Sequence, residues 1–272
     1  MSNLALFYHF YTPLHYGSGT TLSHVDLPVQ RESYTEYPVM PATGIKGVFR
    51  ACYETVNEEA KTEKLFGKGD EEGGLIFTDG RILFFPVKSA RGVFVWTTCP
   101  HVLERFNRDM SIANIELAID LTNINFDNDE QAFVSDDSVL VNNCLILEEL
   151  SFQKKNKIPA EWVQGISNDL DKSRVAIIPN DMFKYFVKNS TEINARIRID
   201  QGKGTVDESA LWYEELVPAE SVFYSLVLER KEKNIEEFSN LITKDSRNFF
   251  QFGGDETLGR GFAKVTLVNS RR

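Results

Sequence analysis

The chain has 272 residues, of which 42% are hydrophobic and 20 are phenylalanine, so it can bury a large core without disulfides or metal ions. Its 40 acidic and 30 basic residues give a formal net charge of −10, which argues against a protein that binds DNA through a basic domain. The three cysteines are far apart in the sequence, which argues against a disulfide framework and a cysteine-based zinc site.

The N-terminal part is predicted to contain a strand, a long loop and a helix. Residues 4–11 are apolar and aromatic, which indicates a strand that ends at Thr12-Pro13. Residues 14–40 hold several glycines and prolines without lasting periodicity, which predicts an ordered loop. From residue 43 to about residue 58 apolar side chains recur at helical spacing, and Thr43 is a suitable N-cap.

The first turn of that predicted helix has the composition of an anion site. Lys46 and Arg50 are four residues apart and share a face. Gly44 and Gly47 flank the lysine, where free N–H groups and the helix dipole favour an anion. A solvated cationic face is the simpler interpretation. However, each glycine costs ~1 kcal/mol relative to alanine inside a helix, which favours a site where phosphate approaches the backbone.

The middle of the chain mixes strands and helices. A glycine- and charge-rich connection covers residues 66–74, and a polar loop is expected at 123–131. The remaining pattern predicts strands at 75–78, 81–87, 92–97, 138–141 and 144–150 and helices at 101–109, 158–170 and 179–189.

The C-terminal part is predicted to begin with a long β-hairpin. Residues 192–199 alternate in polarity and lead through a Gly-Lys-Gly tip to a second strand at 211–216. A strand at 220–229, a helix at 233–249 and a strand at 263–268 follow. The order predicts one α+β domain over residues 1–272, with a ferredoxin-like βαββαβ plan and insertions in the middle.

A second glycine cluster lies between the last predicted helix and strand. Gly253 and Gly254 precede Gly259, Arg260 and Gly261. This density suits either a tight turn that needs positive φ or a backbone that approaches phosphates with Arg260 in support. A nucleotide P-loop is rejected, because Arg260-Gly261 stands where Lys-Ser/Thr is required and the order is helix to strand.

Several titratable residues are candidates for acid–base or metal chemistry. Asp26 and His15 lie in the long loop, where an aspartate is more often a turn former. Glu214 and Glu215 are paired carboxylates near the end of the hairpin, where a solvated strand end is the simpler interpretation. No Gly-x-Ser-x-Gly elbow or dinucleotide fingerprint is present, so catalysis on a small molecule has little support.

Six segments together carry a resemblance that covers nearly the whole chain. They are Thr12-Pro-Leu-His-Tyr-Gly-Ser-Gly, Val25-Asp-Leu-Pro-Val-Gln-Arg-Glu, Ile45-Lys-Gly-Val-Phe-Arg, Leu83-Phe-Phe-Pro-Val-Lys-Ser, Leu211-Trp-Tyr-Glu-Glu-Leu-Val-Pro and Gly253-Gly-Asp-Glu-Thr-Leu-Gly-Arg-Gly. The chain resembles the repeated backbone subunit of type III-B CRISPR (Cmr) effector complexes, within the RAMP (repeat-associated mysterious protein) superfamily. Relatives often carry serines before the Lys-Gly pair, where this chain has Ala42-Thr43-Gly44.

The resemblance implies an architecture and a set of partners. It implies an RNA-recognition-motif-like palm with a functional loop at 12–40, an inserted helical finger region at 100–190 and a thumb hairpin at 192–216. Copies would stack head to tail along the guide CRISPR RNA with other subunits of the Cmr complex. Each thumb would displace one base, so that the complementary target RNA is cut at regular intervals.

The resemblance also implies roles for individual residues. Asp26 is expected to be essential for cleavage and to hold a divalent ion, Mg²⁺ or Mn²⁺, with His15, Glu214 and Glu215 as weaker assistants. The expected guide-phosphate contacts are Lys46, Gly47, Arg50, Gly253, Gly254, Gly259, Arg260 and Gly261. A metal-dependent endoribonuclease needs few groups, because RNA supplies its own 2′-OH nucleophile.

Three other functions stay open from the sequence: a non-catalytic scaffold of the same complex, a guide-processing endoribonuclease that acts alone, and a phosphate-binding metabolic enzyme. The acidic net charge fits a stacking subunit that keeps a basic strip inside the filament, with Arg196, Arg198 and Lys203 as candidates. The first residues lack a secretory leader, and no apolar run approaches the ~20 residues of a membrane span. We therefore expect a cytoplasmic protein with no membrane partner.

Overall fold

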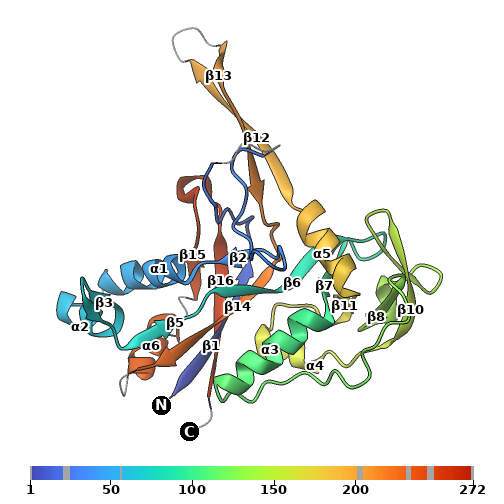
Figure 1. Ribbon diagram of the computed structural model, residues 1–272, viewed down its shortest axis with the longest axis horizontal. Coiled ribbons are helices and arrows are strands. Elements are labelled where there is room, and N and C mark those ends of the chain that lie inside the picture. The colour runs from blue at the N-terminus through green and yellow to red at the C-terminus, as the bar shows by residue number, and fades with distance from the viewer. Residues whose placement is uncertain are drawn as a thin grey trace.

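A mixed β-sheet runs through the molecule and carries helices on both faces (Figure 1). The computed structural model describes residues 2–20, 25–55, 57–200, 205–230, 234–243 and 248–270. In chain order the elements are β1 (Asn3–Phe10), β2 (Val39–Met40), α1 (Ala42–Glu54), α2 (Glu59–Phe66), β3 (Gly67–Lys68), β4 (Glu71–Glu72), β5 (Leu75–Phe77), β6 (Gly80–Lys88), β7 (Phe94–Thr98), α3 (Pro100–Ile112), β8 (Gln131–Val134), β9 (Cys144–Leu147), β10 (Leu150–Lys157), α4 (Glu161–Ile166), β11 (Val175–Ile177), α5 (Asn180–Asn189), β12 (Glu192–Asp200), β13 (Thr205–Leu216), β14 (Val222–Glu229), α6 (Asn234–Thr243), β15 (Phe249–Gln251) and β16 (Phe262–Asn269). The predicted α+β class is confirmed.

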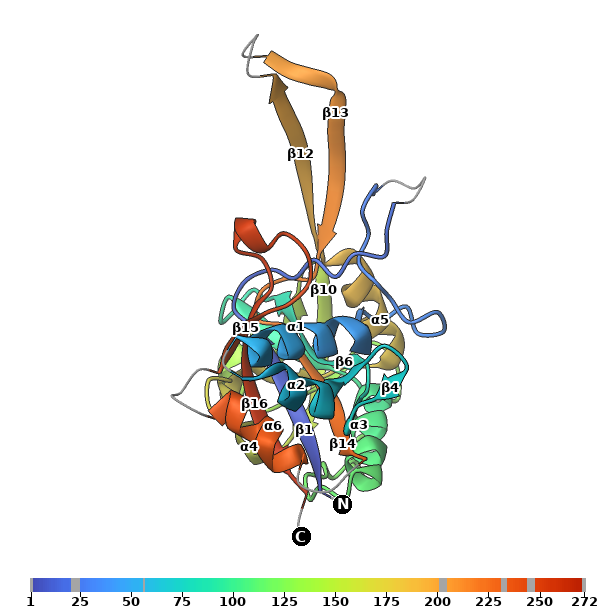
Figure 2. The same ribbon diagram turned by 90° about the vertical axis from the view of Figure 1, so that its left-hand side faces the viewer.

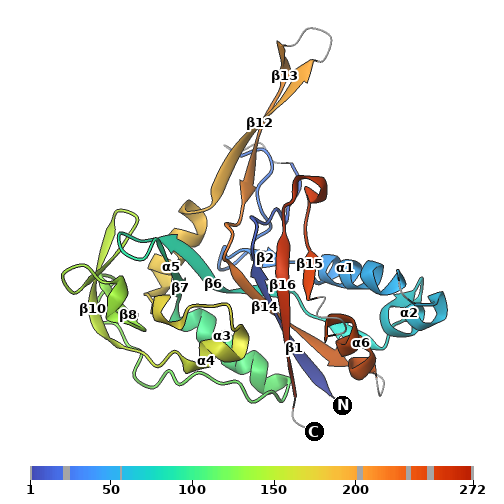
Figure 3. The same ribbon diagram turned by 180° about the vertical axis from the view of Figure 1, so that it is seen from behind.

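Strand β1 is buried on both faces, which explains its continuous apolar sequence. Successive side chains of a strand point to opposite faces. Phe7 contacts Phe106 of α3, with the ring centroids 6.1 Å apart, whereas Tyr8 contacts Phe252 at 5.2 Å. Phe252 in turn contacts Phe49 of α1. Helices therefore cover the sheet from both sides (Figure 3).

The strands around β1 are antiparallel in the order β16–β1–β14–β6. Helices α1 and α6 cover the same face, since the rings of Phe49 and Phe238 lie 5.2 Å apart. Helix α3 contacts β6 and α4 contacts β16. A helix follows the first strands as α1 and precedes the last strands as α6, as the sequence predicts. The N-terminal and C-terminal segments together form the centre of the fold.

The region 100–190 differs from the helical insertion that we expected. It contains α3, α4 and α5, but also β8, β9, β10 and β11, which extend the central sheet beyond β7. Strand β10 has the sequence Leu-Ser-Phe-Gln-Lys-Lys-Asn-Lys and is half exposed. Its second half has no alternation of apolar and polar residues, so the sequence pattern did not predict this strand. The predicted strand at 138–141 is instead a 3₁₀ turn over Asp137–Val139, followed by extended chain.

Two predicted helices are shorter than expected. Helix α4 ends at Ile166 because the backbone becomes extended at Ser167, with φ −156° and ψ 136°. Asp169 further on accepts hydrogen bonds from Tyr11 and Lys264. Helix α6 ends at Thr243, and Phe249–Gln251 pairs with β16 as a strand. The helix predicted from Thr43 is present as α1, but its N-cap is Pro41 and Thr43 makes no side-chain cap.

Strands β12 and β13 form a two-stranded hairpin that projects from the body of the molecule (Figure 2). Its register pairs Glu192 with Leu216 and Arg196 with Trp212, and it shifts between Ile197 and Ile199. The predicted Gly-Lys-Gly tip, including Lys203, lies outside the described residues.

No helix in the described ranges is both long enough and apolar enough to cross a membrane.

A buried ion pair links the 12–40 loop to α3. Both carboxylate oxygens of Glu32 accept hydrogen bonds from Arg105 Nη1 at 2.7 Å. The side chains are only 11% and 2% exposed. Removing one member of such a pair leaves the other charge buried.

We predict that Arg105→Ala lowers the free energy of unfolding by about 3–5 kcal/mol, because Glu32 then has no cation beside it in a poorly hydrated place. Chemical denaturation followed by circular dichroism measures the change. Lys68→Ala, which removes an exposed lysine paired with Glu59, is the control and should leave the midpoint nearly unchanged. Equal midpoints for R105A and the wild type would contradict the prediction.

Candidate functional site

Three segments that are distant in sequence meet at the base of the hairpin: the 12–40 loop, the facing ends of β12 and β13, and the glycine loop of residues 253–261. Arg196 of β12 donates to Glu214 of β13 at 2.7 Å and to Asp255 of the glycine loop at 3.0 Å. Gly254 N donates to His15 O at 2.8 Å, and Gly261 N donates to the carbonyl of Pro13 at 2.9 Å. These contacts define the candidate site.

Asp26 is held against β13 by backbone pairing. Its Oδ2 accepts a hydrogen bond from Tyr213 N at 2.8 Å. Leu27 forms a parallel bridge with Glu214, in which Leu27 N donates to Tyr213 O at 3.1 Å and Glu215 N donates to Leu27 O at 3.0 Å. Within the described ranges, the second carboxylate oxygen of Asp26 has no hydrogen-bond partner.

His15 is attached to the same strand two residues further on. Its Nδ1 lies 2.9 Å from Glu215 O. A carbonyl oxygen only accepts, so Nδ1 carries the proton. Nε2 is then the nitrogen that can take up or release a proton. A Cβ on Gly17 would lie 2.8 Å from this Nε2. Glycine at residue 17 therefore avoids a steric clash with the imidazole ring.

Both glutamates of the predicted acid–base pair are buried, at 5% and 6% exposure. Glu214 accepts from Trp212 Nε1 at 2.8 Å and from Arg196 Nε at 2.7 Å. Burial raises the pKa of the Glu214 carboxyl, but these hydrogen bonds outweigh it and the net pKa is lowered. The carboxylate is therefore ionised and bound to donors of the protein itself.

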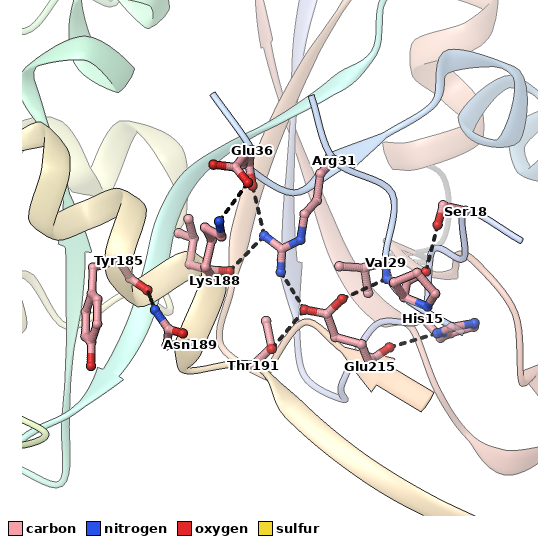
Figure 4. Close-up of polar contacts among 12 residues, drawn as sticks. His15, Ser18, Val29, Arg31, Glu36, Tyr185, Lys188, Asn189, Thr191 and Glu215 are labelled. Atoms are coloured by element: carbon pink, nitrogen blue, oxygen red, sulfur yellow. Dashed lines mark hydrogen bonds and ion pairs between the residues drawn. The ribbon is translucent and has the colours of Figure 1, made fainter. Parts of the chain in front are cut away.

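Glu215 is bound still more completely (Figure 4). Oε1 accepts from Arg31 Nη2 at 2.5 Å and from Thr191 Oγ1 at 2.9 Å, and Oε2 accepts from Val29 N at 3.0 Å. All three donors belong to the protein itself. The geometry therefore gives Glu215 a role in holding the loop, β12 and β13 together.

The two glycines of α1 have different environments. A Cβ on Gly44 would lie 1.8 Å from Tyr16 Oη, whereas a Cβ on Gly47 would meet nothing within 4 Å. Internal packing against Tyr16 therefore explains Gly44. Gly47 is exposed, and nothing inside the described chain requires its lack of a side chain.

The cations of α1 also differ. Arg50 Nε lies 2.8 Å from Glu54 Oε1, and its Nη1 donates to Gly67 O at 2.9 Å. Lys46 is half-buried and has no ion-pair or hydrogen-bond partner among the described residues. Of the two predicted phosphate contacts, Lys46 is the one whose charge is unmatched within the described part of the chain.

The glycine loop combines structural glycines with one open position. Gly253 has φ +80°, and a Cβ there would lie 2.4 Å from His15 O. Gly261 has φ +70°, and its Cβ would lie 1.8 Å from Phe252 O. Gly259 has φ +73° with nothing within 4 Å. Arg260 follows it, and its Nε is buried without a partner in the described residues.

The described residues do not form a complete metal site by themselves. No three His, Cys, Asp or Glu side chains in the described ranges gather closely enough to hold an ion. Glu214 and Glu215 are bound to donors, which leaves one oxygen of Asp26. Magnesium often uses one or two carboxylates together with substrate phosphates and water, so these residues fit such an ion only if a bound substrate supplies phosphate oxygens.

Residues 8–264 match the RAMP superfamily. The chain belongs to this superfamily. It is 40% identical to the CRISPR system Cmr endoribonuclease Cmr4 of Pyrococcus furiosus, over 94% of this chain and 92% of that protein. It is 26% identical to the CRISPR system CMR subunit Cmr4 of Saccharolobus solfataricus, over 95% and 94% of the two chains.

Solved structures agree with this RAMP assignment. The oligomeric Cmr4 of Pyrococcus furiosus superposes with a TM-score of 0.76 at 29% identity and 100% coverage of both chains. A chain of the type III-B Cmr-beta complex bound to cognate target RNA superposes with a TM-score of 0.77, covering 97% of this chain and 96% of that one. At 21% identity, the latter match shows the fold alone.

The structure of this RAMP protein brings some of the predicted residues together. Asp26, His15, Glu214, Glu215 and the glycine loop all lie at the hairpin base. Lys46 and Arg50 lie on α1, which contacts the 12–40 loop where Gly44 meets Tyr16.

Sequence reasoning missed Tyr16, Arg31 and Trp212. All three lie in the segments that carry the family resemblance. The contacts of Tyr16 with Gly44 and of Arg31 with Val187 and Glu215 join residues that are apart in sequence, so only the fold shows them. Trp212 donates to Glu214, only two residues further on.

We predict opposite effects of alanine at the two glycines of α1. Gly47→Ala should raise the free energy of unfolding by about 1 kcal/mol, because alanine is the better helix former at an open position. Gly44→Ala should lower it, because the new methyl group collides with Tyr16. Thermal melting of both variants measures the difference, and a destabilised G47A protein would show that the site is not open.

Proposed function

We propose that this chain is the repeated backbone subunit of a type III-B RNA-guided effector complex, and that it cleaves RNA complementary to the guide. One observation carries the catalytic part. Asp26 and His15 are fixed to alternate residues of β13 through contacts that leave one carboxylate oxygen and one ring nitrogen uncommitted among the described residues. The superfamily membership and the similarity to an endoribonuclease support this proposal.

The proposed reaction is transesterification within the target RNA. The 2′-oxygen forms a bond to the adjacent phosphorus, the bond to the 5′-oxygen breaks, and a 2′,3′-cyclic phosphate and a 5′-hydroxyl result. His15 Nε2 accepts the 2′ proton or protonates the leaving oxygen. Asp26 orients the 2′-OH or holds Mg²⁺ or Mn²⁺, which would stabilise the charge on the phosphoryl oxygens. Glu214 and Glu215 hold the site in place.

We propose that the antiparallel strands β16–β1–β14–β6 with α1 and α6 are the βαββαβ palm. The region 100–190 would be the finger, and the projecting hairpin at 192–216 would be the thumb that displaces one base. Copies would stack head to tail in the cytoplasm, along the guide and with other Cmr subunits. The relative crystallised as an oligomer supports self-association.

The proposed guide contacts fall into two groups. Lys46, Gly47, Gly259 and Arg260 have open backbone or uncommitted side-chain atoms within the described residues. Gly253, Gly254 and Gly261 instead shape the glycine loop that contains Gly259 and Arg260. The expected basic strip on the hairpin needs a correction at Arg196, because Glu214 and Asp255 neutralise it.

A non-catalytic scaffold of the same complex is the second candidate. Glu214 and Glu215 both accept hydrogen bonds from the protein itself. This favours the scaffold function, because few side chains then remain for acid–base or metal chemistry. Cleavage by the assembled complex that depends on Asp26 distinguishes the two candidates.

We predict that Asp26→Asn lowers cleavage by the guide-loaded complex at least ~100-fold, because the uncharged amide holds a cation much more weakly than a carboxylate and does not act as a base. Labelled complementary RNA is incubated with each complex, with and without EDTA. Asp181→Asn, an exposed change at the start of α5, is the control and should cut normally. Normal cutting by D26N would remove the proposed role of Asp26.

We predict that Lys46→Ala weakens guide binding and reduces the slope of log K against log salt by ~0.7 for each single-strand phosphate that Lys46 neutralises. Arg50→Ala should have a smaller effect, because Arg50 is already paired with Glu54. Filter binding at several salt concentrations measures both variants. Lys172→Ala, in an exposed turn of the finger region, is the matched control. A slope for K46A equal to that of the wild type would exclude Lys46 from the guide site.

A further inference from the structure

Asp26 can act only if its loop stays on the hairpin base. Its own anchor is one hydrogen bond to Tyr213 N, next to a short bridge at Leu27. Such exposed backbone contacts open easily. A further contact must therefore hold the loop if the carboxylate is to keep a fixed position.

Arg31 supplies this contact from within the same segment. Its Nη1 donates to Glu36 O and to Val187 O, both at 2.9 Å, and its Nη2 donates to Glu215 Oε1 at 2.5 Å. The guanidinium thus joins the loop itself, α5 and β13 (Figure 4). Its side chain is 20% exposed, and that of Glu215 is 8% exposed.

The partners of Arg31 lie in different elements of the structure. Val187 lies in the last turn of α5, where carbonyls lack helical partners and a cation is favourable. Glu215 also accepts from Thr191, which directly precedes β12, and from Val29 N. Arg31 therefore ties the Asp26 segment to α5 and to Glu215 of β13, which also binds Val29 and the residue before β12.

A second contact strengthens the same junction. The carboxylate of Glu36 receives Lys184 and Lys188 of α5, at 2.8 Å and 2.7 Å. Hydrogen bonds from these lysines lower the pKa of Glu36 to about 2. The turn that Arg31 binds through its Glu36 carbonyl is thus itself tied to α5.

We propose that Arg31 is a positioning residue for RNA cleavage: by binding Glu215, Val187 O and Glu36 O together, it holds the Asp26 segment in place on β13. This inference rests on the proposed function. Arginine is required because its planar fork reaches several acceptors at once, whereas a lysine ammonium is a single point charge. The loss of Arg31 leaves Glu215 with two donors but without its cation, so the loop should loosen and the free energy of unfolding should fall. Arg31→Lys keeps a positive charge at this residue.

The test uses complexes assembled on guide RNA with wild-type, Arg31→Ala or Arg31→Lys subunits. Single-turnover cleavage is measured at saturating labelled target, together with target affinity. We expect R31A to lower the cleavage rate at least ~10-fold, with target affinity changed less than about twofold, because a misplaced reactive group affects the chemical step rather than ground-state binding. R31K should recover part of the rate by keeping one contact.

Hydrogen exchange provides a readout independent of activity. In R31A the Val29 amide, which donates to Glu215, should exchange faster, while amides of β1 should not change. Arg91→Ala is the matched control, because Arg91 Nη1 also donates to a distant carbonyl, that of Leu140, but lies far from Asp26 in the sequence. It should cut at the wild-type rate.

The outcomes separate this inference from the proposed function. A wild-type complex that does not cut RNA would refute the proposed function. If the wild type cuts and R31A cuts equally fast with unchanged exchange at Val29, only the role of Arg31 is refuted. Should R31A fail to assemble, R31K decides: a rate within twofold of the wild type overturns the proposal, and a slower rate with normal assembly supports it.

Discussion

The buried carboxylate of Glu215 is the interaction on which the candidate site depends. An ionised carboxylate away from water must be matched by donors. Here those donors come from Arg31, Val29 and Thr191, two of which lie more than 180 residues away in the sequence. Because no single segment can satisfy this charge, the 12–40 loop, the hairpin and α5 are held in one arrangement.

The same requirement separates the carboxylates that are bound by several donors from the side chains that keep an uncommitted atom. Glu214 and Glu215 are bound to donors, so their carboxylates maintain geometry. Asp26 and His15 are each held through one atom, which leaves the other atom for chemistry within the described residues. Rigid support around a small number of available groups is what positioned catalysis requires.

The acidic net charge is compatible with an RNA-binding role because the charges are distributed unevenly. Several surface cations, including Arg196 and Arg50, are neutralised by neighbouring carboxylates. Lys46 is not neutralised among the described residues, and it lies beside the open backbone of Gly47. Affinity for a backbone phosphate depends on such local groups, since exposed charges farther than ~8 Å are screened at physiological salt.

The sequence by itself determined the α+β class, the central strands, α1 and the hairpin, because each has strong local periodicity or turn chemistry. It also placed Asp26, His15 and the glycine loop among the candidates, mainly through the family resemblance.

Strand β10 was missed because its lysines interrupt the alternating pattern of a strand. Helix α6 was predicted too long because Phe249–Gln251 pairs with β16 as a strand. Only the tertiary structure decided that Gly44 serves packing while Gly47 stays open, and that the Glu215 carboxylate accepts hydrogen bonds from Arg31, Val29 and Thr191. The physical reason is that burial and hydrogen-bond partners come from residues distant in sequence, which local pattern does not record.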